Sequence, residues 1–423
     1  MSGRQAAILP ASQDARMDIP APEELIGLVR ALPAAPPLLA AVGDETGVYL
    51  VGGAIRDLLL GATVPGPGDL DLVFEGDVAA LAARLGGRSL VHARFGTASV
   101  ILDGHGYDFA MARRESYAEP GALPDVWPAT LVEDLLRRDF TVNAIAVALG
   151  RPRAGELTAA PGALEDLSAG RLRVLHDRSF IDDPTRLLRL ARYQSRLGFE
   201  IEPATLTLAR AAASGGALST VSGPRVGAEL RLIAREEDPV AALTALHELG
   251  VDRAIHPSFG LADPALARRA LALLPPEGRR DVLAITLAAR RVPSSELAPL
   301  LDDLAFEADA RDAALAAATG AEVLAGALAR AARPSEIAAA VGRGSVELVA
   351  LAGSLGPEQQ ARDWLERLRH VRLEIDGDDL IAAGIPTGPA VGQALQAALA
   401  AKLDGRASGR DAELAEALRA ISA

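Results

Sequence analysis

The chain has 423 residues, of which 50% are hydrophobic, and its formal net charge is -13 at pH 7. This length allows a large core and more than one domain. Because the chain contains no cysteine, disulfides, cysteine-ligated zinc and thiolate nucleophiles are excluded. A negative net charge is unusual for a nucleic-acid-binding protein, although only the local field at a binding groove matters.

Almost all of the positive charge is arginine, because Lys402 is the only lysine. A P-loop, kinase or Schiff-base lysine is therefore excluded from the preceding part of the chain, and a triphosphate would be held by arginine, backbone amides and metal. The first residues contain no apolar segment typical of a signal peptide, and no uncharged apolar run of about 18 residues follows. We therefore expect a cytoplasmic protein with no membrane partner.

Residues 1–45 are rich in proline and alanine and are expected to form an N-terminal extension with one short amphipathic segment. From 46 to 150, strand-like segments such as VYLV, LDLVF and YDFAMA alternate with helix-like segments such as AIRDLLLG and DVAALAARLG. This alternation predicts a small mixed α/β domain with a partly antiparallel sheet. The sequence DGHG, between two strand-like segments, predicts a hairpin turn.

After RRDFTVNAIAVAL the apolar residues recur at helical spacing almost to the end of the chain. The pattern predicts a helical domain at 151–235, a helical body at 236–370 and a helical tail at 371–423. The expected fold class is therefore α+β, with a mixed α/β head domain followed by an all-helical remainder.

The segment VYLVGGAIRDLLLG contains two adjacent glycines, Gly52 and Gly53, and the next glycine, Gly61, closes the following helix. A dinucleotide fingerprint requires G-x-G-x-x-G, so this interpretation fails on spacing. What remains is a strand, a tight turn and a helix start whose free N–H groups can face a phosphate. The pattern alone fits a plain turn equally well.

The strand DLDLVF places Asp69 and Asp71 on one face and Leu70 and Leu72 on the other. Two neighbouring carboxylates repel each other unless a cation lies between them, and oxygen ligands of this kind suit Mg²⁺. Asp108, on an expected neighbouring strand, is placed to reach the same face and complete a site for two metals. The alternative is an exposed strand edge with solvated charges.

Taken together, the GGAIRD turn, the D-x-D strand and the strand around Asp108 resemble the nucleotidyltransferase superfamily. The details are similar to its class II tRNA nucleotidyltransferase and bacterial poly(A) polymerase branch. RRDFTVNA at 137–144 resembles the ribose-selecting motif of that family, and DDPTRLLRLAR at 182–192 resembles its nucleobase template. LEDLSAGRLRVL and VSGPRVGAEL extend the resemblance, which covers about 48–235 and derives its specificity from the combination.

The resemblance implies a nucleotidyltransferase head at 46–150, a nucleobase-recognising neck at 151–235, and a body and tail that grip RNA. It implies a Mg²⁺-dependent enzyme that adds C, A or both to tRNA 3′ ends from CTP and ATP without a nucleic-acid template. A poly(A) polymerase is the close alternative, and a small-molecule nucleotidyltransferase fits the helical blocks less well. A non-catalytic RNA-binding relative is disfavoured by the intact pair of Asp69 and Asp71.

The resemblance also assigns residues to the site. Asp69 and Asp71 would bind Mg²⁺ and help to deprotonate the RNA 3′-hydroxyl, and Asp108 would be the third catalytic carboxylate. The nucleotide-binding residues that it implies are Gly52, Gly53, Arg56, Arg138, Asp139, Asn143, Asp182, Asp183, Arg186, Arg189 and Arg192.

Within the head, the resemblance implies that Gly53 and Arg56 contact the triphosphate, while Asp57 holds the turn or Arg56. Arg138 would hold phosphate. Asp139 would accept a hydrogen bond from the ribose 2′-hydroxyl and so reject deoxynucleotides.

In the neck, Asp183 and Arg186 would read the base edge, and Arg189 and Arg192 would add positive charge near the phosphates. Taken alone, RLLRLAR is better explained as a solvated helix face, and only the neighbouring blocks reverse that interpretation. The template opens with Asp182 where CCA-adding relatives usually carry Glu. In addition, the loop at 115–136 has no basic residue, so the order and range of nucleotides added stay open.

Overall fold

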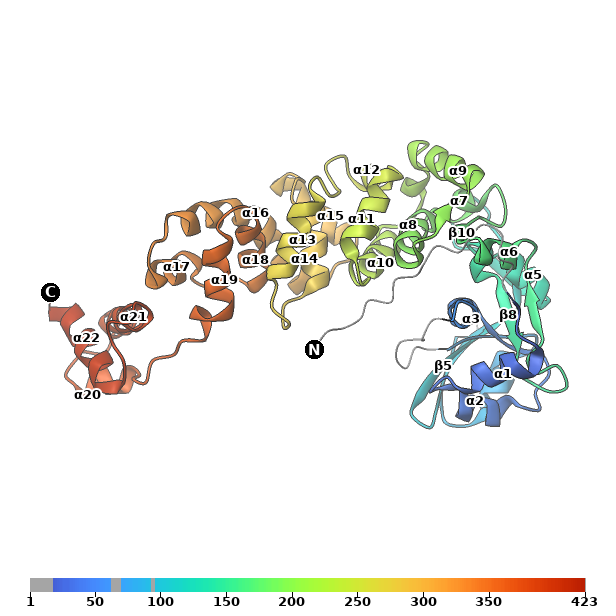
Figure 1. Cartoon of the computed structure of the whole chain (residues 1–423), viewed down its shortest axis with the longest axis horizontal. Helices are drawn as coiled ribbons and strands as arrows, with labels where there is room; N and C mark the ends of the chain where they lie inside the picture. The colour runs from blue at the N-terminus through green and yellow to red at the C-terminus, as the bar shows by residue number, and fades with distance from the viewer. Residues whose placement is uncertain (1–17, 62–69, 93–95, 423) are drawn as a thin grey trace. The chain divides into compact units, whose positions relative to one another are not determined.

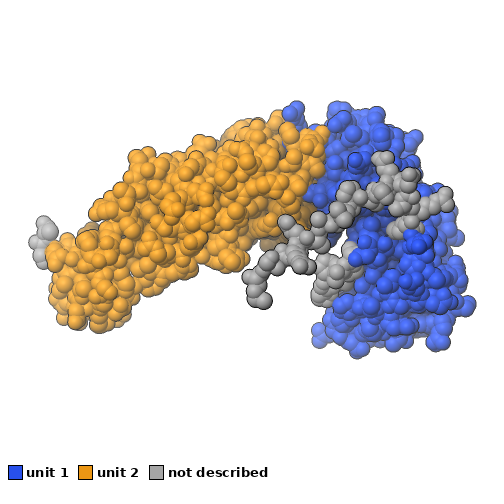
Figure 2. All heavy atoms as spheres, in the orientation of Figure 1, with its two compact units in different colours: residues 1–222, 249–254 blue, residues 223–248, 255–423 orange. Residues whose placement is uncertain are grey.

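The computed structural model describes residues 18–61, 70–92 and 96–422, and these form two compact units (Figure 2). Unit 1 comprises residues up to 222 together with 249–254, and unit 2 comprises 223–248 and the chain from 255 onward. The expected head and neck residues therefore fall within one unit up to residue 222. Figure 1 shows the mixed sheet in the first part of the chain and helices in the rest.

Unit 1 contains one large sheet, two small ones and surrounding helices. Its elements are, in chain order, α1 (Pro22–Arg30), α2 (Ala35–Val42), β1 (Val48–Val51), α3 (Gly53–Leu59), β2 (Leu70–Phe74), α4 (Val78–Leu85), β3 (Arg88–His92), β4 (Thr97–Leu102), β5 (His105–Met111), β6 (Arg113–Ser116), β7 (Asp125–Pro128), α5 (Leu131–Leu136), η2 (Thr141–Asn143), β8 (Ile145–Ala148), β9 (Leu157–Ala159), α6 (Ala163–Ser168), β10 (Arg171–Leu172), α7 (Ser179–Asp182), α8 (Arg186–Leu197), β11 (Glu200–Ile201), α9 (Pro203–Ser214) and η3 (Ala217–Thr220).

The large sheet has the strand order β3-β4-β5-β2-β1-β8-β9. β2 and β5 run parallel, and the other neighbouring pairs are antiparallel, which confirms the prediction of a mixed sheet. The predicted hairpin joins β4 to β5 through Asp103 and Gly104, whose φ angles are 49° and 82°. Positive φ at both central residues matches the twist of the flanking strands, which explains why Asp-Gly occupies this turn.

The register of β2 and β5 separates an apolar face of the sheet from a polar one. Leu70 lies opposite Tyr107, and both side chains are buried. One residue further along, Asp71 lies opposite Asp108. Since side chains alternate along a strand, the two carboxylates project from the face opposite to the buried pair.

Two helices from the expected N-terminal extension belong to the packed part of unit 1. Leu25 of α1 and Leu38 and Val42 of α2 are fully buried. The hydroxyl of Tyr107 donates to the backbone carbonyl of Ala34 at 2.7 Å, which ties this segment to the apolar face of the sheet. Residues 22–42 therefore contribute to the core around the head.

Helix α8 carries a buried apolar face and several arginines at helical spacing. Leu187, Leu188 and Leu190 are fully buried, as expected for an amphipathic helix in a folded domain. Helix α8 ends at Leu197, and the following Gly198 adopts the left-handed conformation that favours glycine at a helix C-terminus. This packing fixes the face from which the arginines project.

Unit 2 is helical throughout its described residues. Its elements are α10 (Gly223–Ala234), α11 (Pro239–Glu248), α13 (Pro264–Leu273), α14 (Arg280–Ala289), α15 (Ser294–Asp303), α16 (Ala308–Arg330), α17 (Pro334–Val341), α18 (Val346–Ser354), α19 (Glu358–Glu366), η4 (Leu368–His370), α20 (Gly377–Ala382), α21 (Pro389–Leu403) and α22 (Arg410–Ser422), while α12 (Val251–Ile255) straddles the division.

By length and apolar composition, α16 is long enough to cross a membrane, as is the sharply bent pair of α17 and α18 if it is counted as one span. However, α16 packs against α14, α15, α17 and α18. Its buried residues follow helical spacing from Ala314 to Leu328. One face of α16 is therefore packed against the other helices of unit 2.

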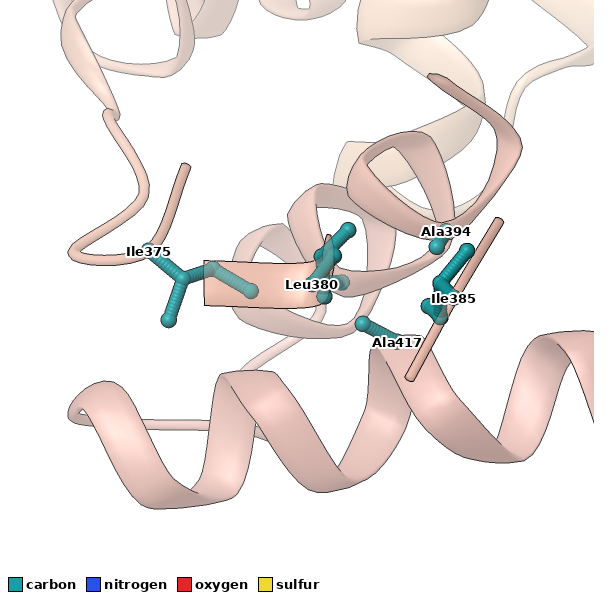
Figure 3. Packing of buried hydrophobic residues seen from close by; sticks show 6 residues of the cluster. Ile375, Leu380, Ile385, Ala394 and Ala417 are labelled. Carbon is teal, nitrogen blue, oxygen red and sulfur yellow. The ribbon is translucent and has the colours of Figure 1, made fainter. Parts of the chain in front are cut away.

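The last three helices enclose an apolar cluster of their own, shown in Figure 3. Leu380 is fully buried at its centre, between Ile375 and Ile385. The buried carboxylate of Glu413 accepts hydrogen bonds from Lys402 Nζ at 2.6 Å and from the backbone of Glu374 at 2.7 Å. The expected tail segment, 371–423, therefore has its own core.

Candidate active site

Three polar side chains form a row across neighbouring strands of the large sheet. Ser99 on β4 lies opposite Asp108 on β5, which in turn lies opposite Asp71 on β2. Adjacent strands are about 4.8 Å apart, so the carboxylates of the two aspartates are close neighbours. Ser99 Oγ donates to Asp108 Oδ1 at 2.6 Å and orients that carboxylate. The structure thus brings Asp108 beside Asp71, as the sequence predicts.

Asp69, the other expected metal ligand, lies outside the described residues. Within the described part of the chain, no group of three His, Asp or Glu side chains is arranged to hold a metal ion. Asp71 and Asp108 nevertheless provide carboxylate oxygens on the same sheet face, and this donor set suits a hard divalent cation. The residues present fit the metal that the sequence implies.

A cavity of about 350 Å³ opens beside this row and is lined by Asp71, Ser99, Asp108 and Arg138, among others. Arg138 Nη2 donates to Asp134 Oδ2 at 3.0 Å. Its Nε is buried and has no hydrogen-bond partner among the described residues. Because Arg138 lines the cavity, its guanidinium is placed to bind an anion such as a phosphate there through charge-assisted hydrogen bonds.

Asp134 on α5 connects two consecutive arginines. Its Oδ1 accepts from Arg137 Nη2 at 2.6 Å, while its Oδ2 accepts from Arg138. The side chain has no exposed surface. Burial alone would raise the pKa of the Asp134 carboxyl, but the charges and hydrogen bonds of the two arginines hold that pKa below its ordinary value. Asp134 therefore stays ionised and keeps Arg138 at the cavity.

The glycine turn leads directly into the helix that carries Arg56. Gly52 has φ 72° and ψ -133°, a backbone conformation that favours glycine, and helix α3 begins directly after it. Arg56 is almost fully buried, and its Nε donates to Asp57 Oδ1 at 2.8 Å. Its Nη1 donates to Asn143 Oδ1 at 2.7 Å. The expected contact between Arg56 and Asp57 is present.

Asp139 is surrounded by donors. Oδ1 accepts from the backbone N–H of Phe140 at 2.8 Å and from Asn143 Nδ2 at 3.1 Å. Oδ2 accepts from Arg189 Nε at 2.9 Å and Nη2 at 2.6 Å. Burial opposes ionisation, but these partners, with Arg189 the strongest, lower the pKa of Asp139 to about 2.

Tyr193 lies among three of the expected phosphate-side arginines. The guanidinium carbons of Arg56, Arg189 and Arg192 are 5.5, 5.6 and 4.9 Å from the centroid of its ring. Its ring edge meets Phe140, with centroids 5.9 Å apart. A cation over an aromatic face is stabilised by the ring quadrupole. The ring therefore gathers positive charge from α3 and α8 in one place.

The expected template residues lie at the junction of α7 and α8. Asp183 Oδ1 accepts from the hydroxyl of Thr185 at 2.6 Å and closes the turn between the two helices. Arg186 is buried, and its terminal nitrogens donate to Ser179 Oγ and to the backbone carbonyl of Arg137, each at 2.7 Å. Both terminal nitrogens of Arg186 thus have protein partners.

Asp182 and Arg186 line a second cavity, of about 450 Å³, together with Arg137, Tyr117 and His176. Arg137 borders this cavity, whereas Arg138 borders the cavity of the carboxylate row. Burial and neighbouring arginines lower the pKa of His176, which favours its neutral form. Of the predicted residues, Asp71, Asp108 and Arg138 thus line one cavity, and Asp182 and Arg186 line the other.

The family model described as the poly A polymerase head domain matches residues 48–173, the segment that carries the carboxylate row and Asp139. The CC-adding tRNA nucleotidyltransferase of Deinococcus radiodurans is 37% identical over 359 residues, which is 84% of each chain. The chain belongs to the tRNA nucleotidyltransferase and poly(A) polymerase family. Nucleotidyltransferases of this family generally use a divalent metal.

Two further relatives extend the comparison. The A-adding tRNA nucleotidyltransferase of Geobacter sulfurreducens is 35% identical over 408 residues, covering 90% of this chain and 46% of the relative. The chain spans about half or less of the length of the A-adding relatives that it matches. The solved Thermotoga maritima CCA-adding enzyme, complexed with tRNA, has a TM-score of 0.79 at 28% identity and covers 96% of this chain and 100% of that one.

For this tRNA nucleotidyltransferase family member, three positioning side chains were not among the residues predicted from the sequence: Ser99, Asp134 and Tyr193. Asp134 had a readable signal, because it precedes the two arginines by three and four residues on one helical face. Tyr193 follows Arg189 by four residues on α8, which is the same kind of signal. No local sequence pattern indicated Ser99, because its partner Asp108 lies on the neighbouring strand.

Proposed function

We propose that this protein transfers nucleotides from CTP or ATP to the 3′ end of tRNA in the cytoplasm. The observation that carries the proposal is the placement of Asp71 and Asp108 side by side, with Arg138 lining the same cavity. The tRNA substrate is inferred from the relatives named A-adding and CC-adding enzymes, and from the neighbour complexed with tRNA.

In the proposed reaction the RNA 3′-oxygen bonds to the α-phosphorus while the bond to pyrophosphate breaks, and the hydroxyl proton passes to a base or to solvent. Mg²⁺ held by Asp69, Asp71 and Asp108 would supply Lewis-acid activation and charge neutralisation. Arg138, which lines the same cavity as the carboxylate row, would bind phosphate through its guanidinium. Arg56 would add positive charge from the glycine turn.

The nucleotide added is proposed as C, A or both. A relative named for A addition is 35% identical to this chain, and one named for CC addition is 37% identical. Sequence identity therefore does not distinguish A addition from CC addition. Labelled CTP or ATP offered with tRNAs lacking A, CA or CCA would distinguish them. Long A tails on unrelated RNA would indicate a poly(A) polymerase, and no transfer to any RNA would contradict the proposal.

Base choice is expected to depend on Asp183 and Arg186. Cytosine and adenine both present an amino donor beside a ring-nitrogen acceptor, whereas uracil and guanine present the reverse pattern. A mismatched base leaves buried polar groups unpaired, at a cost of about 1–3 kcal/mol each. We therefore expect use of CTP or ATP and refusal of UTP and GTP, and we expect Asp183→Ala to lose selectivity as well as rate.

The measurement is kcat/KM for all four nucleotides in the wild type and the variant. Asp183→Asn retains an acceptor for the Thr185 hydroxyl and tests whether the turn alone matters. Asp177→Ala, at an exposed acid earlier in the neck, is the matched control. Equal slowing of all four nucleotides in Asp183→Ala would show that Asp183 only supports the fold.

The tail is proposed to contribute to RNA binding. Removing residues 371–423 is expected to raise the KM for tRNA more than the KM for nucleotide, because the lining of the carboxylate-row cavity lies between residues 51 and 138 and includes no residue of the tail. Steady-state kinetics with each substrate varied would measure both constants, and thermal unfolding would check the truncated chain. Equal changes in both constants, or unfolding, would favour a structural role for the tail.

A further inference from the structure

The carboxylate of Asp139 has no remaining capacity to accept a hydrogen bond in this structure. A carboxylate provides about four acceptor sites. Donors from Phe140 and Asn143 occupy Oδ1, and two nitrogens of Arg189 occupy Oδ2. The side chain is only 7% exposed. A ribose hydroxyl would therefore have to displace one of these donors before Asp139 could accept its hydrogen bond.

These partners differ in how readily they can leave. The Phe140 donor is a backbone N–H, and Asn143 is held from its other side by Arg56. Arg189 is a long side chain with 30% of its surface exposed, whereas Arg56 is 2% exposed. Of the partners described for Asp139, Arg189 is thus the one that can exchange its carboxylate for another anion.

Tyr193 lies next to both Arg189 and Arg56, so an anion near its ring would meet both guanidiniums. Arg189 packs over the ring of Tyr193 and donates to its hydroxyl at 3.3 Å. Arg56 packs over the same ring. A phosphate arriving near these guanidiniums would compete with Asp139 for Arg189, because Arg binds phosphate and carboxylate with similar bidentate geometry.

We propose that Arg189 blocks Oδ2 of Asp139, and that the triphosphate of the incoming nucleotide draws Arg189 away from this oxygen. We call this blocking contact between Arg189 and Asp139 the latch. With Arg189 drawn to phosphate, Oδ2 of Asp139 becomes free to accept the hydrogen bond of the 2′-hydroxyl. The sugar is then read only in a ligand whose phosphates are bound. This inference rests on the proposed function, since it assumes that the site takes a nucleoside triphosphate.

The test is equilibrium binding of ATP, dATP, adenosine and 2′-deoxyadenosine to the full chain at pH 8, where Asp139 stays ionised. The wild type is expected to prefer ATP over dATP by about 10- to 100-fold, as for a hydrogen bond to a charged group. It is expected to bind the two nucleosides within about twofold of each other. Asp139→Asn is expected to lose the preference for ATP.

Arg189→Gln removes the latch but leaves the acceptor. This variant is expected to bind triphosphates more weakly, to keep its preference for ATP over dATP, and to gain a preference of about tenfold for adenosine over deoxyadenosine. Arg196→Gln removes a positive charge from the exposed last turn of the same helix and is the matched control, with unchanged nucleoside discrimination. Arg189→Lys, a point charge without the guanidinium fork, is expected to behave between the wild type and Arg189→Gln.

Two results would overturn the latch. If Arg189→Gln loses the preference for ATP as Asp139→Asn does, Arg189 orients Asp139 instead of masking it. If the wild type discriminates adenosine from deoxyadenosine as strongly as ATP from dATP, Oδ2 is already available. When nucleosides bind too weakly to measure, the ATP and dATP comparison in Arg189→Gln decides. Because binding needs no tRNA, failure of transfer would contradict the proposed function while leaving this result standing.

Discussion

Asp71→Asn is expected to lower kcat for nucleotide addition by about 1000-fold or more, while tRNA binding and folding stay close to those of the wild type. The substitution removes one of two neighbouring carboxylates on the polar face of the sheet, and with it a proposed ligand of the divalent cation. A catalytic metal contributes several kcal/mol of charge stabilisation, and about 4 kcal/mol corresponds to that loss of rate. Chelation of the metal is expected to have the same effect on the wild type.

Asp103→Asn is the matched control for this variant. Asp103 lies in the β4–β5 turn of the same sheet, is exposed and has φ 49°, a conformation that asparagine tolerates. Single-turnover kinetics with labelled ATP or CTP and circular dichroism of each variant would provide the measurements. Activity of Asp71→Asn within tenfold of the control would exclude a metal-binding role for this carboxylate.

Asp134→Asn is expected to lower kcat/KM for the nucleotide by about 100-fold, mainly through a higher KM for the nucleotide. Asp134 is fully buried between Arg137 and Arg138, and the amide would face both guanidiniums without a charge to balance them. Removing one partner of a buried ion pair typically costs about 3–5 kcal/mol. Part of this cost is expected as lost stability, and part as misplacement of Arg138 at the cavity.

Glu133→Gln is the matched control, because it removes the same charge from the neighbouring residue of α5. Glu133 is exposed and closes a capping box with Thr130, a role that glutamine can also fill. A purely structural role for Asp134 would lower the melting temperature and change the KM values for tRNA and nucleotide together. A selective rise in the KM for the nucleotide is the outcome that supports positioning of Arg138.

The low pKa of Asp139 makes the stability of the folded protein depend on pH. Its pKa of about 2 lies below the ordinary value, so its ion pair with Arg189 stabilises the folded protein above about pH 4. That contribution is lost as the pH falls from about 4 toward 2, where the folded-state carboxylate takes up its proton. Near neutral pH the Asp139 carboxylate is fully ionised, and the latch depends on competition between anions.

Many features that the sequence predicts correctly follow from local repeating patterns. The alternation in LDLVF predicts that Asp71 projects from the face opposite Leu70 and Leu72, and the structure agrees. The Asp-Gly turn predicts the β4–β5 hairpin for a reason confined to a few φ angles. Helical spacing in RLLRLAR likewise predicts the apolar and basic faces of α8. In these cases the short-range geometry of the backbone determines the outcome.

The placement of Asp69 on the same strand face as Asp71 remains a prediction, because Asp69 lies outside the described residues. The roles assigned to the individual site residues are likewise still predictions. What the structure adds is their surroundings: Ser99 beside Asp108, Asp134 between two arginines, and Tyr193 beneath three of them. Each of these contacts joins side chains whose separation or orientation the linear pattern leaves open.

The sequence by itself determined the α+β class, the order of the strand and helix segments, and the family, because periodicity and motif spacing are properties of the chain alone. Only the tertiary structure decided that Asp139 is held by Arg189, which lies 50 residues away, and that Arg186 is buried against Ser179. The physical reason is that burial and competition among donors depend on which segments pack together. A carboxylate motif specifies a charge, whereas its neighbours in space determine which group that charge can bind.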